Sequence, residues 1–134
     1  MASPTDTPTQ QPFTGAFGII QSHPDERTTI VAVEGELDLG RAPSFKWALV
    51  DSLDAGYRQL VVDLTHVTFM DSTALGVLVG VNRSLDVGAR MAIVCVHPNV
   101  LKIFELSGMD GSFAIYPTPD QALDYVRGHT SRIG

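Results

Sequence analysis

The 134-residue sequence predicts one α/β domain whose sheet is parallel or mixed. A chain of this length suits a single compact domain. Segments typical of strands and helices follow one another in the order β-β-α-β-α-β-α-β-α, which implies right-handed connections between about five neighbouring strands. Residues 60–64 and 91–96 are nearly continuous apolar runs, typical of strands covered on both faces.

The amino-terminal part contains a polar tail and a predicted hairpin. Residues 1–12 are rich in Thr, Pro and Gln and have no apolar period, so we expect a disordered tail before a domain spanning 13–134. Strands are predicted at 17–20 and at 28–33, where β-branched residues are frequent. A polar turn is expected between them at 22–26.

A loop and the first helix follow the hairpin. The loop is expected over 35–40, with Glu-Leu-Asp-Leu at its centre. Pro43 suits the first turn of a helix. Apolar residues then recur at helical spacing as far as Leu53, and Gly56 provides a typical end.

The central part of the chain contains a strand, a loop and a second helix. The strand is predicted at 60–64 and the loop at 65–70. Asp71, Ser72 and Thr73 open the helix, which is expected to continue to about Asp86 and to stop at Gly88.

Four shorter elements complete the prediction. A strand is expected at 91–96 and a short helix at 99–106, which Ser107-Gly108 ends. The last strand is predicted at 113–116. Asp120 is expected to cap the final helix, 121–127.

The composition argues against several classes of function. The formal net charge is −6, and the nine Lys and Arg residues are scattered, so no nucleic-acid surface is expected. The sequence has no secretory signal, and its longest apolar run is too short to span a membrane, so we expect no membrane partner and a cytoplasmic location. Cys95 is the single cysteine, stands among apolar residues and is expected to be a buried, inert thiol.

No catalytic, cofactor or metal site is predicted. His23, His66, His97 and His129 share no spacing typical of metal ligands. A hydrolase elbow requires Gly on both sides of the nucleophile, where Ser72 has Met70 and Ala74. The chain also lacks a Gly-rich phosphate loop followed by Lys. We therefore expect a binding module and not an enzyme.

Asp71 and Ser72 form the most informative local pattern. Either side chain could cap the predicted helix by accepting a hydrogen bond from a free backbone N–H. One cap is enough, so Asp71 can fill that role and leave the Ser72 hydroxyl at the surface. A phosphate on Ser72 would then meet the positive end of the helix dipole, which the fold tolerates.

Gly76 and Gly80 lie four residues apart on one face of the same predicted helix. Each glycine costs about 1 kcal/mol in a helix interior. We expect the glycines to allow a close approach to the sheet or to a neighbouring helix. A membrane dimer motif is rejected, because the segment is too short and polar.

Three segments carry a resemblance to a known family. Residues 67–80, VTFMDSTALGVLVG, strongly resemble the signature of STAS domains, specifically the bacterial anti-sigma factor antagonists. Residues 33–39, VEGELDL, and 106–110, LSGMD, resemble two further segments of that family. The resemblance covers about 15–126 and implies a mixed sheet of about five strands, with about four helices packed mainly on one face.

The resemblance also implies a switch. In that family a serine-kinase anti-sigma factor phosphorylates a Ser at the start of the second helix, which by position is Ser72. The unphosphorylated form binds the anti-sigma factor and frees the sigma factor, and a serine phosphatase reverses the modification. Thr73 leaves the acceptor slightly ambiguous. Ala74 and Arg41 depart from the residues usual at their positions, and Arg41 could alter the choice of partner.

The sequence therefore predicts an anti-sigma factor antagonist, a phosphoprotein that regulates transcription by partner switching in stress response or sporulation. The surface expected to bind the partner consists of six residues: Asp38, Leu39, Gly40, Asp71, Ser72 and Thr73. Alternatives are a STAS scaffold of a stress-signalling complex and an accessory subunit of a lipid transporter; a hydrolase is a distant third.

Overall fold

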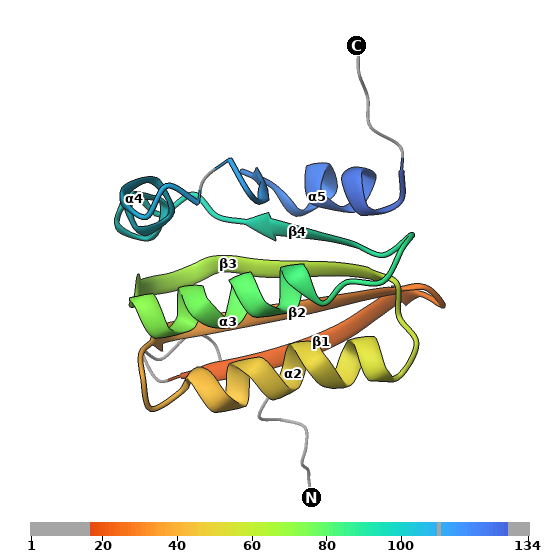
Figure 1. Cartoon of the computed structure of the whole chain (residues 1–134), viewed down its shortest axis with the longest axis horizontal. Coiled ribbons are helices and arrows are strands. Elements are labelled where there is room, and N and C mark those ends of the chain that lie inside the picture. Colours follow the sequence, from red (N-terminus) through yellow and green to blue (C-terminus); the bar gives the residue numbers. More distant parts are fainter. Residues whose placement is uncertain (1–16, 110, 129–134) are drawn as a thin grey trace, which may run out of the picture.

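The computed structural model describes residues 17–109 and 111–128. The described chain forms five strands and four helices (Figure 1). The strands are β1 (Gly18–Asp25), β2 (Thr28–Leu37), β3 (Gln59–Met70), β4 (Arg90–Val94) and β5 (Ala114–Tyr116). The helices are α2 (Ala42–Asp54), α3 (Ser72–Arg83), α4 (Pro98–Leu106) and α5 (Pro119–Val126).

The five strands form one sheet in the order β1-β2-β3-β4-β5. β1 and β2 are antiparallel, while β2, β3, β4 and β5 pair in parallel. A helix lies between each pair of consecutive parallel strands. The predicted α/β fold with a mixed, mostly parallel sheet is confirmed.

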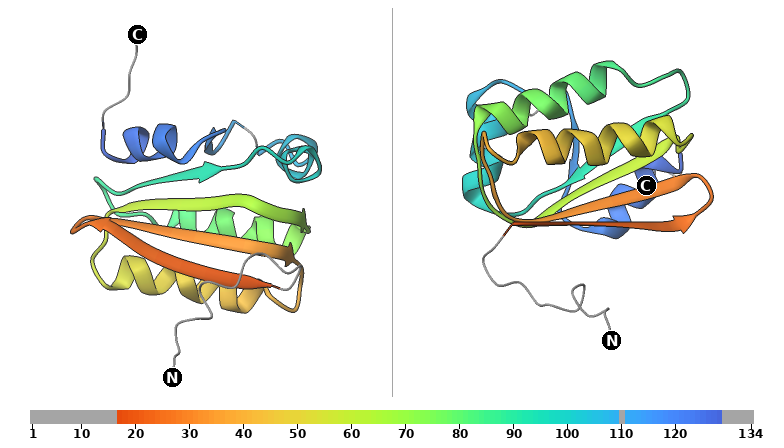
Figure 2. Two further views of the ribbon diagram at one scale, coloured as in Figure 1. Left: turned by 180° about the vertical axis from the view of Figure 1, so that it is seen from behind. Right: turned by 90° about the horizontal axis from the view of Figure 1, so that it is seen from below.

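The helices cover the two faces of the sheet unequally. α2, α3 and α4 lie on one face and α5 lies on the other (Figure 2). The main core fills the space under the first three helices, where Phe45, Leu78 and Phe104 are fully buried. A smaller core under α5 consists of Val61, Ala92, Val94, Ala122 and Val126. The prediction that the helices pack mainly on one face is therefore confirmed.

β2 and β3 extend further than the sequence suggested. The predicted loop at 65–70 is wrong, because β3 continues to Met70, and β2 likewise continues to Leu37 within the predicted loop at 35–40. The two extensions pair with each other, from Glu34 with His66 to Leu37 with Met70. Pairing between these distant segments makes them strands, which the local sequence does not reveal.

The first hairpin is also longer than predicted. β1 runs to Asp25, so the polar turn expected at 22–26 shrinks to the residues between Asp25 and Thr28. The Asp25 carboxylate accepts a hydrogen bond of 2.8 Å from the Arg27 N–H and pairs with the Arg127 guanidinium at 2.9 Å. β2 begins directly after this turn, and its first two residues, Thr28 and Thr29, are fully buried.

Some helix ends lie where the sequence predicted them, and others do not. Gly56 and Gly108 follow α2 and α4 with φ of 102° and 75°, as expected of glycines that end helices. α3 ends at Arg83, so Gly88 lies in the following turn and does not stop it. Thr118 caps α5, which places Asp120 inside the first turn and corrects its predicted role as the cap.

Two further predictions concern the amino-terminal tail and membrane-spanning segments. The predicted tail, 1–12, and the first residues of the predicted domain lie outside the described residues. Among the described helices, none is long and apolar enough to cross a membrane.

Candidate functional site

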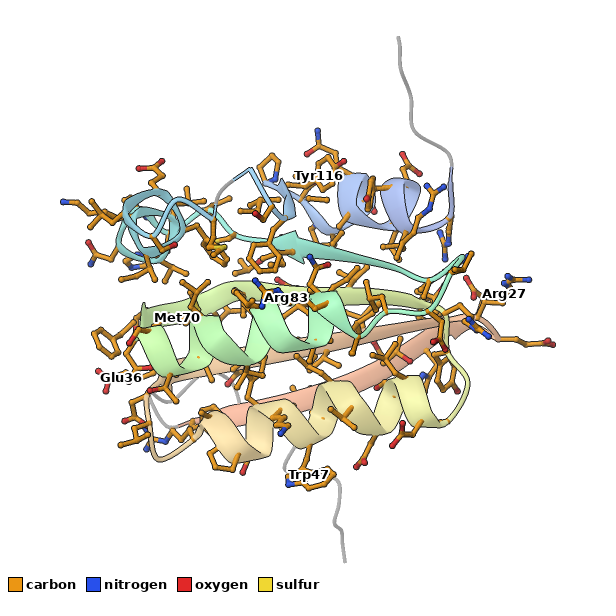
Figure 3. The ribbon with its side chains drawn as sticks, viewed as in Figure 1. Arg27, Glu36, Trp47, Met70, Arg83 and Tyr116 are labelled. Carbon is orange, nitrogen blue, oxygen red and sulfur yellow. The ribbon has the colours of Figure 1, made fainter. Side chains whose placement is uncertain are left out.

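The candidate site lies at the edge of the sheet where the parallel strands β2 and β3 end. Leu37 and Met70 are register partners, so the two strands finish side by side. Figure 3 shows Glu36 and Met70 at this end, opposite Arg27 at the other. The Asp71 N–H donates to the Leu37 carbonyl oxygen at 3.2 Å, one residue beyond the paired strands. The start of α3 is thus fixed against the segment that leaves β2.

Asp71 is the N-cap of α3. Its backbone is extended, with φ −103° and ψ −179°, and its Oδ1 atom accepts hydrogen bonds from the N–H groups of Thr73 (3.0 Å) and Ala74 (3.1 Å). These are two of the N–H groups that a helix cannot pair internally. The prediction that Asp71 caps the helix is confirmed.

Ser72 is the first residue of α3, and its side chain is exposed. Because Asp71 supplies the cap, the Ser72 hydroxyl has no hydrogen bond to any described residue. The same holds for the exposed hydroxyl of Thr73. Two adjacent hydroxyl groups, neither of them bonded to the part of the chain that the structure describes, therefore lie at the positive end of the helix dipole.

Asp38 organises the turn between β2 and α2. Its carbonyl oxygen accepts from the N–H groups of Arg41 and Ala42, both at 3.0 Å. Its carboxylate accepts from the Arg41 N–H at 3.2 Å and forms an ion pair with the Arg41 guanidinium at 3.5 Å. Asp38 is therefore a loop acid that holds the start of the helix containing Pro43, although Arg41 occupies the N-cap position.

Arg41 is held from two sides. Its guanidinium lies 5.4 Å from the centre of the Phe17 ring, in addition to its pairing with Asp38. Both charged side chains of the pair are 41% exposed, so water screens their attraction. Arg41 offsets part of the negative charge that Asp38 and Asp71 bring to this edge.

Two exposed apolar side chains border the polar groups. Leu39 is 69% exposed in the turn after β2, and Phe69 is 46% exposed near the end of β3. Phe69 is the register partner of Glu36, two positions before Asp71. The sequence prediction included Leu39 and missed Phe69, because it assigned 65–70 to a loop. Strict alternation would have placed Phe69 on the buried face with Val67, but the β2–β3 register shifts between Gly35 and Glu36, so Phe69 is exposed and Met70 is buried. This shift depends on pairing with β2, so no local signal in the sequence marks Phe69.

The structure thus brings the predicted residues together in two groups. Asp38, Leu39 and Gly40 lie on the turn after β2, while Asp71, Ser72 and Thr73 open α3. The Leu37–Asp71 hydrogen bond joins the two groups. The binding and phosphorylation roles of these residues stay predictions.

Cys95 adds no exposed thiol to this edge. Cys95 is buried, with 3% of its surface exposed, and burial raises the pKa of its thiol to about 11. Among residues 17–109 and 111–128, no three His, Cys, Asp or Glu side chains are placed to hold a metal ion. The described site therefore offers hydroxyl groups, carboxylates and apolar surface.

Comparison with protein families gives a direct match. A family described as the STAS domain matches residues 20–122. A Thermotoga neapolitana protein assigned by name to the anti-sigma factor antagonists is 31% identical over 105 residues, which cover 77% of this chain and 93% of the relative. An anti-sigma-B factor antagonist of Staphylococcus aureus is 34% identical over 80 residues, covering 59% of this chain and 74% of that protein.

Solved structures agree with this match. The crystal structure of an anti-sigma factor antagonist from Mycobacterium paratuberculosis has a TM-score of 0.78 and 28% identity, over 85% of this chain and 97% of the other. The antagonist SpoIIAA in its unphosphorylated form has a TM-score of 0.72 at 24% identity, over 85% of this chain and all of the other. A Bacillus SpoIIAA structure in the phosphorylated form has a TM-score of 0.64 at 23% identity, over 82% of this chain and 100% of the other.

Proposed function

The chain belongs to the STAS domain family, among the anti-sigma factor antagonists, and we propose that phosphorylation of Ser72 switches its binding to an anti-sigma factor. Antagonists of this family are non-enzymatic regulators. In the proposed cycle, the unphosphorylated chain binds an anti-sigma factor with serine-kinase activity and so frees a sigma factor. The kinase phosphorylates Ser72, binding is lost, and a serine phosphatase restores the active form.

The observation that carries the proposal is that Asp71 caps α3 while the Ser72 side chain takes no part in the cap. The Asp71 carboxylate accepts from the N–H groups of Thr73 and Ala74, so the cap does not depend on Ser72. The Ser72 side chain is exposed and makes no hydrogen bond to a described residue. A kinase can therefore reach the hydroxyl without breaking a contact of the fold.

The phosphate would change the surface more than the fold. It carries about −1.5 to −2 charges at neutral pH. The helix N-terminus offsets part of that charge, so α3 should keep its structure. The same general fold is found in SpoIIAA in both the phosphorylated and the unphosphorylated form, which supports this expectation.

The partner surface would respond differently. Asp38 and Asp71 already make the edge acidic, and Leu39 adds exposed apolar surface. A partner that fits this edge offers donors or cations matched to those carboxylates. A bulky dianion on Ser72 would be mispaired and poorly hydrated in that interface. Mispaired charge at an interface costs on the order of 2–5 kcal/mol, so affinity should fall by roughly thirty-fold or more.

The test is calorimetric titration of the anti-sigma kinase, identified by pull-down and mass spectrometry, with four forms of the chain. The parent and Ser72→Ala should bind with similar affinity, since the substitution removes only a hydroxyl, whereas the phosphorylated parent should bind at least about thirty-fold more weakly. Ser72→Ala should also resist phosphorylation. Ser44→Ala is a matched control, because Ser44 is an exposed serine in the first turns of α2. Equal binding of the phosphorylated parent, or full phosphorylation of Ser72→Ala, would refute the proposal.

A further inference from the structure

A groove runs between the outer sides of α2 and α3. Its volume is about 750 Å³. The two helices lie side by side on one face of the sheet, as Figures 1 and 2 show. Aliphatic side chains from both helices line it, together with two glycines: Val50, Leu53, Val77, Val81, Gly76 and Gly80.

The two glycines open onto this groove and not onto the sheet. A Cβ atom added at Gly76 or at Gly80 would meet no heavy atom within 4 Å. Neither glycine has a positive φ, so the backbone does not require glycine. The prediction that they allow close packing inside the domain is therefore wrong. Glycine weakens a helix relative to alanine, and here the described fold gains nothing in return.

The space that these glycines leave suits a helix from another molecule. The groove follows α3 from Thr73 to Ser84, about 16 Å at 1.5 Å per residue, or about three helical turns. Both walls are helices, whose backbone groups are already paired. An extended peptide would find no strand edge here and would bury unpaired amide groups. A helix pairs its own backbone and can place an apolar face in the groove.

The charged residues of the groove differ between its ends. Lys46 stands in the second turn of α2, while Asp54 ends α2 and Asp86 follows the end of α3. All three line the groove, and the Arg58 guanidinium is 3.7 Å from the Asp86 carboxylate. A complementary helix would carry an acidic side chain toward Lys46 and basic side chains toward the other end.

We propose that this groove receives an amphipathic helix of the anti-sigma factor, with an acidic residue at the Lys46 end and basic residues at the Asp54 end. The inference rests on the proposed function. The groove begins at Thr73, next to Ser72, so one partner can cover both sites. Phosphorylation at one end would then displace a partner held along the whole groove.

The first test is to fill the groove at its far end with Gly80→Leu. Gly80 lies eight residues from Ser72, about 12 Å along α3, so the leucine does not touch the phosphorylation site. The variant should melt at or above the temperature of the parent, since leucine favours the helix. It should bind the purified anti-sigma kinase at least about tenfold more weakly, and Asp54→Lys should also weaken binding. Arg83→Leu is the control, because Arg83 is exposed on α3 but does not line the groove.

The second test is a photo-crosslinker at Val77, which should attach to a helical segment of the kinase. If the pull-down with the parent yields no kinase, the proposed function fails and the inference fails with it. If the parent binds and folded Gly80→Leu binds within twofold, only the groove inference is refuted. A change in the oligomeric state of free Gly80→Leu would show that a second copy occupies the groove, which also refutes it.

Discussion

Asp71 and Leu37 are joined by a backbone hydrogen bond of 3.2 Å between the N–H of Asp71 and the carbonyl oxygen of Leu37. The bond connects the end of β2 to the residue that caps α3. It does not involve the Asp71 side chain, so the backbone arrangement of the site and the cap can be disrupted separately.

Replacing Asp71 with alanine tests the cap alone. Asp71→Ala should lower the free energy of unfolding by about 1 kcal/mol, because the N–H groups of Thr73 and Ala74 lose their acceptor. Phosphorylation should also be slower, since Ser72 can then turn inward to cap the helix. Urea denaturation and a kinase assay measure the two effects. Asp71→Asn retains a capping oxygen, so its free energy of unfolding and its rate of phosphorylation should stay close to those of the parent. If Asp71→Ala equals the parent in both assays, Asp71 neither stabilises α3 as its cap nor keeps Ser72 available to the kinase.

Thr73 provides a test of which hydroxyl accepts the phosphate. Thr73→Ala should still be phosphorylated to full stoichiometry, and the modified peptide should carry the phosphate on Ser72. The reason is position, since Ser72 is the residue that the family motif places at the start of the second helix. Mass spectrometry of the kinase reaction gives the site. Loss of phosphorylation in Thr73→Ala with Ser72 intact would assign the switch to Thr73.

Incubation with labelled ATP in the absence of any kinase tests the non-enzymatic assignment. The chain should neither hydrolyse ATP nor label itself, because the sequence lacks a phosphate-binding loop. Ser72→Ala serves as the blank for labelling at the site. Stoichiometric label on the parent alone would mean that the chain activates its own Ser72.

Exposed apolar side chains beside the site should contribute to binding. Phe69→Ala and Leu39→Ala should each weaken binding to the anti-sigma kinase by about tenfold, equal to about 1.4 kcal/mol, because buried apolar anchors carry much of the energy of an interface. Val87→Ala is the control, since Val87 is fully exposed in the turn after α3. If both variants bind as the control does, the partner does not cover this edge.

Cys95 should make stability depend on pH in the alkaline range. Burial raises the pKa of this thiol from 9.0 to about 11, so the folded state holds the proton more tightly than the unfolded state. The contribution is complete below pH 9 and is lost as the pH rises toward 11. Subtracting the unfolding free energies of Cys95→Ala from those of the parent at each pH isolates the effect from the titration of other groups. A difference that stays constant from pH 8 to 11 would contradict the assignment.

Much of the fold and the cap could be predicted because their signals are local. The order of elements follows from periodicity and apolar runs, and an acid followed by two hydroxyl residues marks the start of α3. The extensions of β2 and β3 could not be read in this way. Glu34–Leu37 and His66–Met70 become strands by pairing with one another, across about thirty residues of sequence.

The two glycines of α3 show a second limit of the sequence. Their spacing places Gly76 and Gly80 on one helix face, and that part of the prediction holds. Which neighbour fills the space beside them depends on where α2 lies, and α2 leaves the space open. The same limit applies to Phe69, whose exposure depends on the register of β3 with β2.

The strand order β1-β2-β3-β4-β5 has a consequence for synthesis on the ribosome. Each strand after β1 pairs with the one made just before it, so each new strand finds a partner that has already emerged from the exit tunnel. The sheet can grow in one direction as translation proceeds, beginning with the β1–β2 hairpin. Because α5 follows β4 and β5 in the chain, the apolar residues of β4 that face α5, Ala92 and Val94, stay uncovered until α5 has been made.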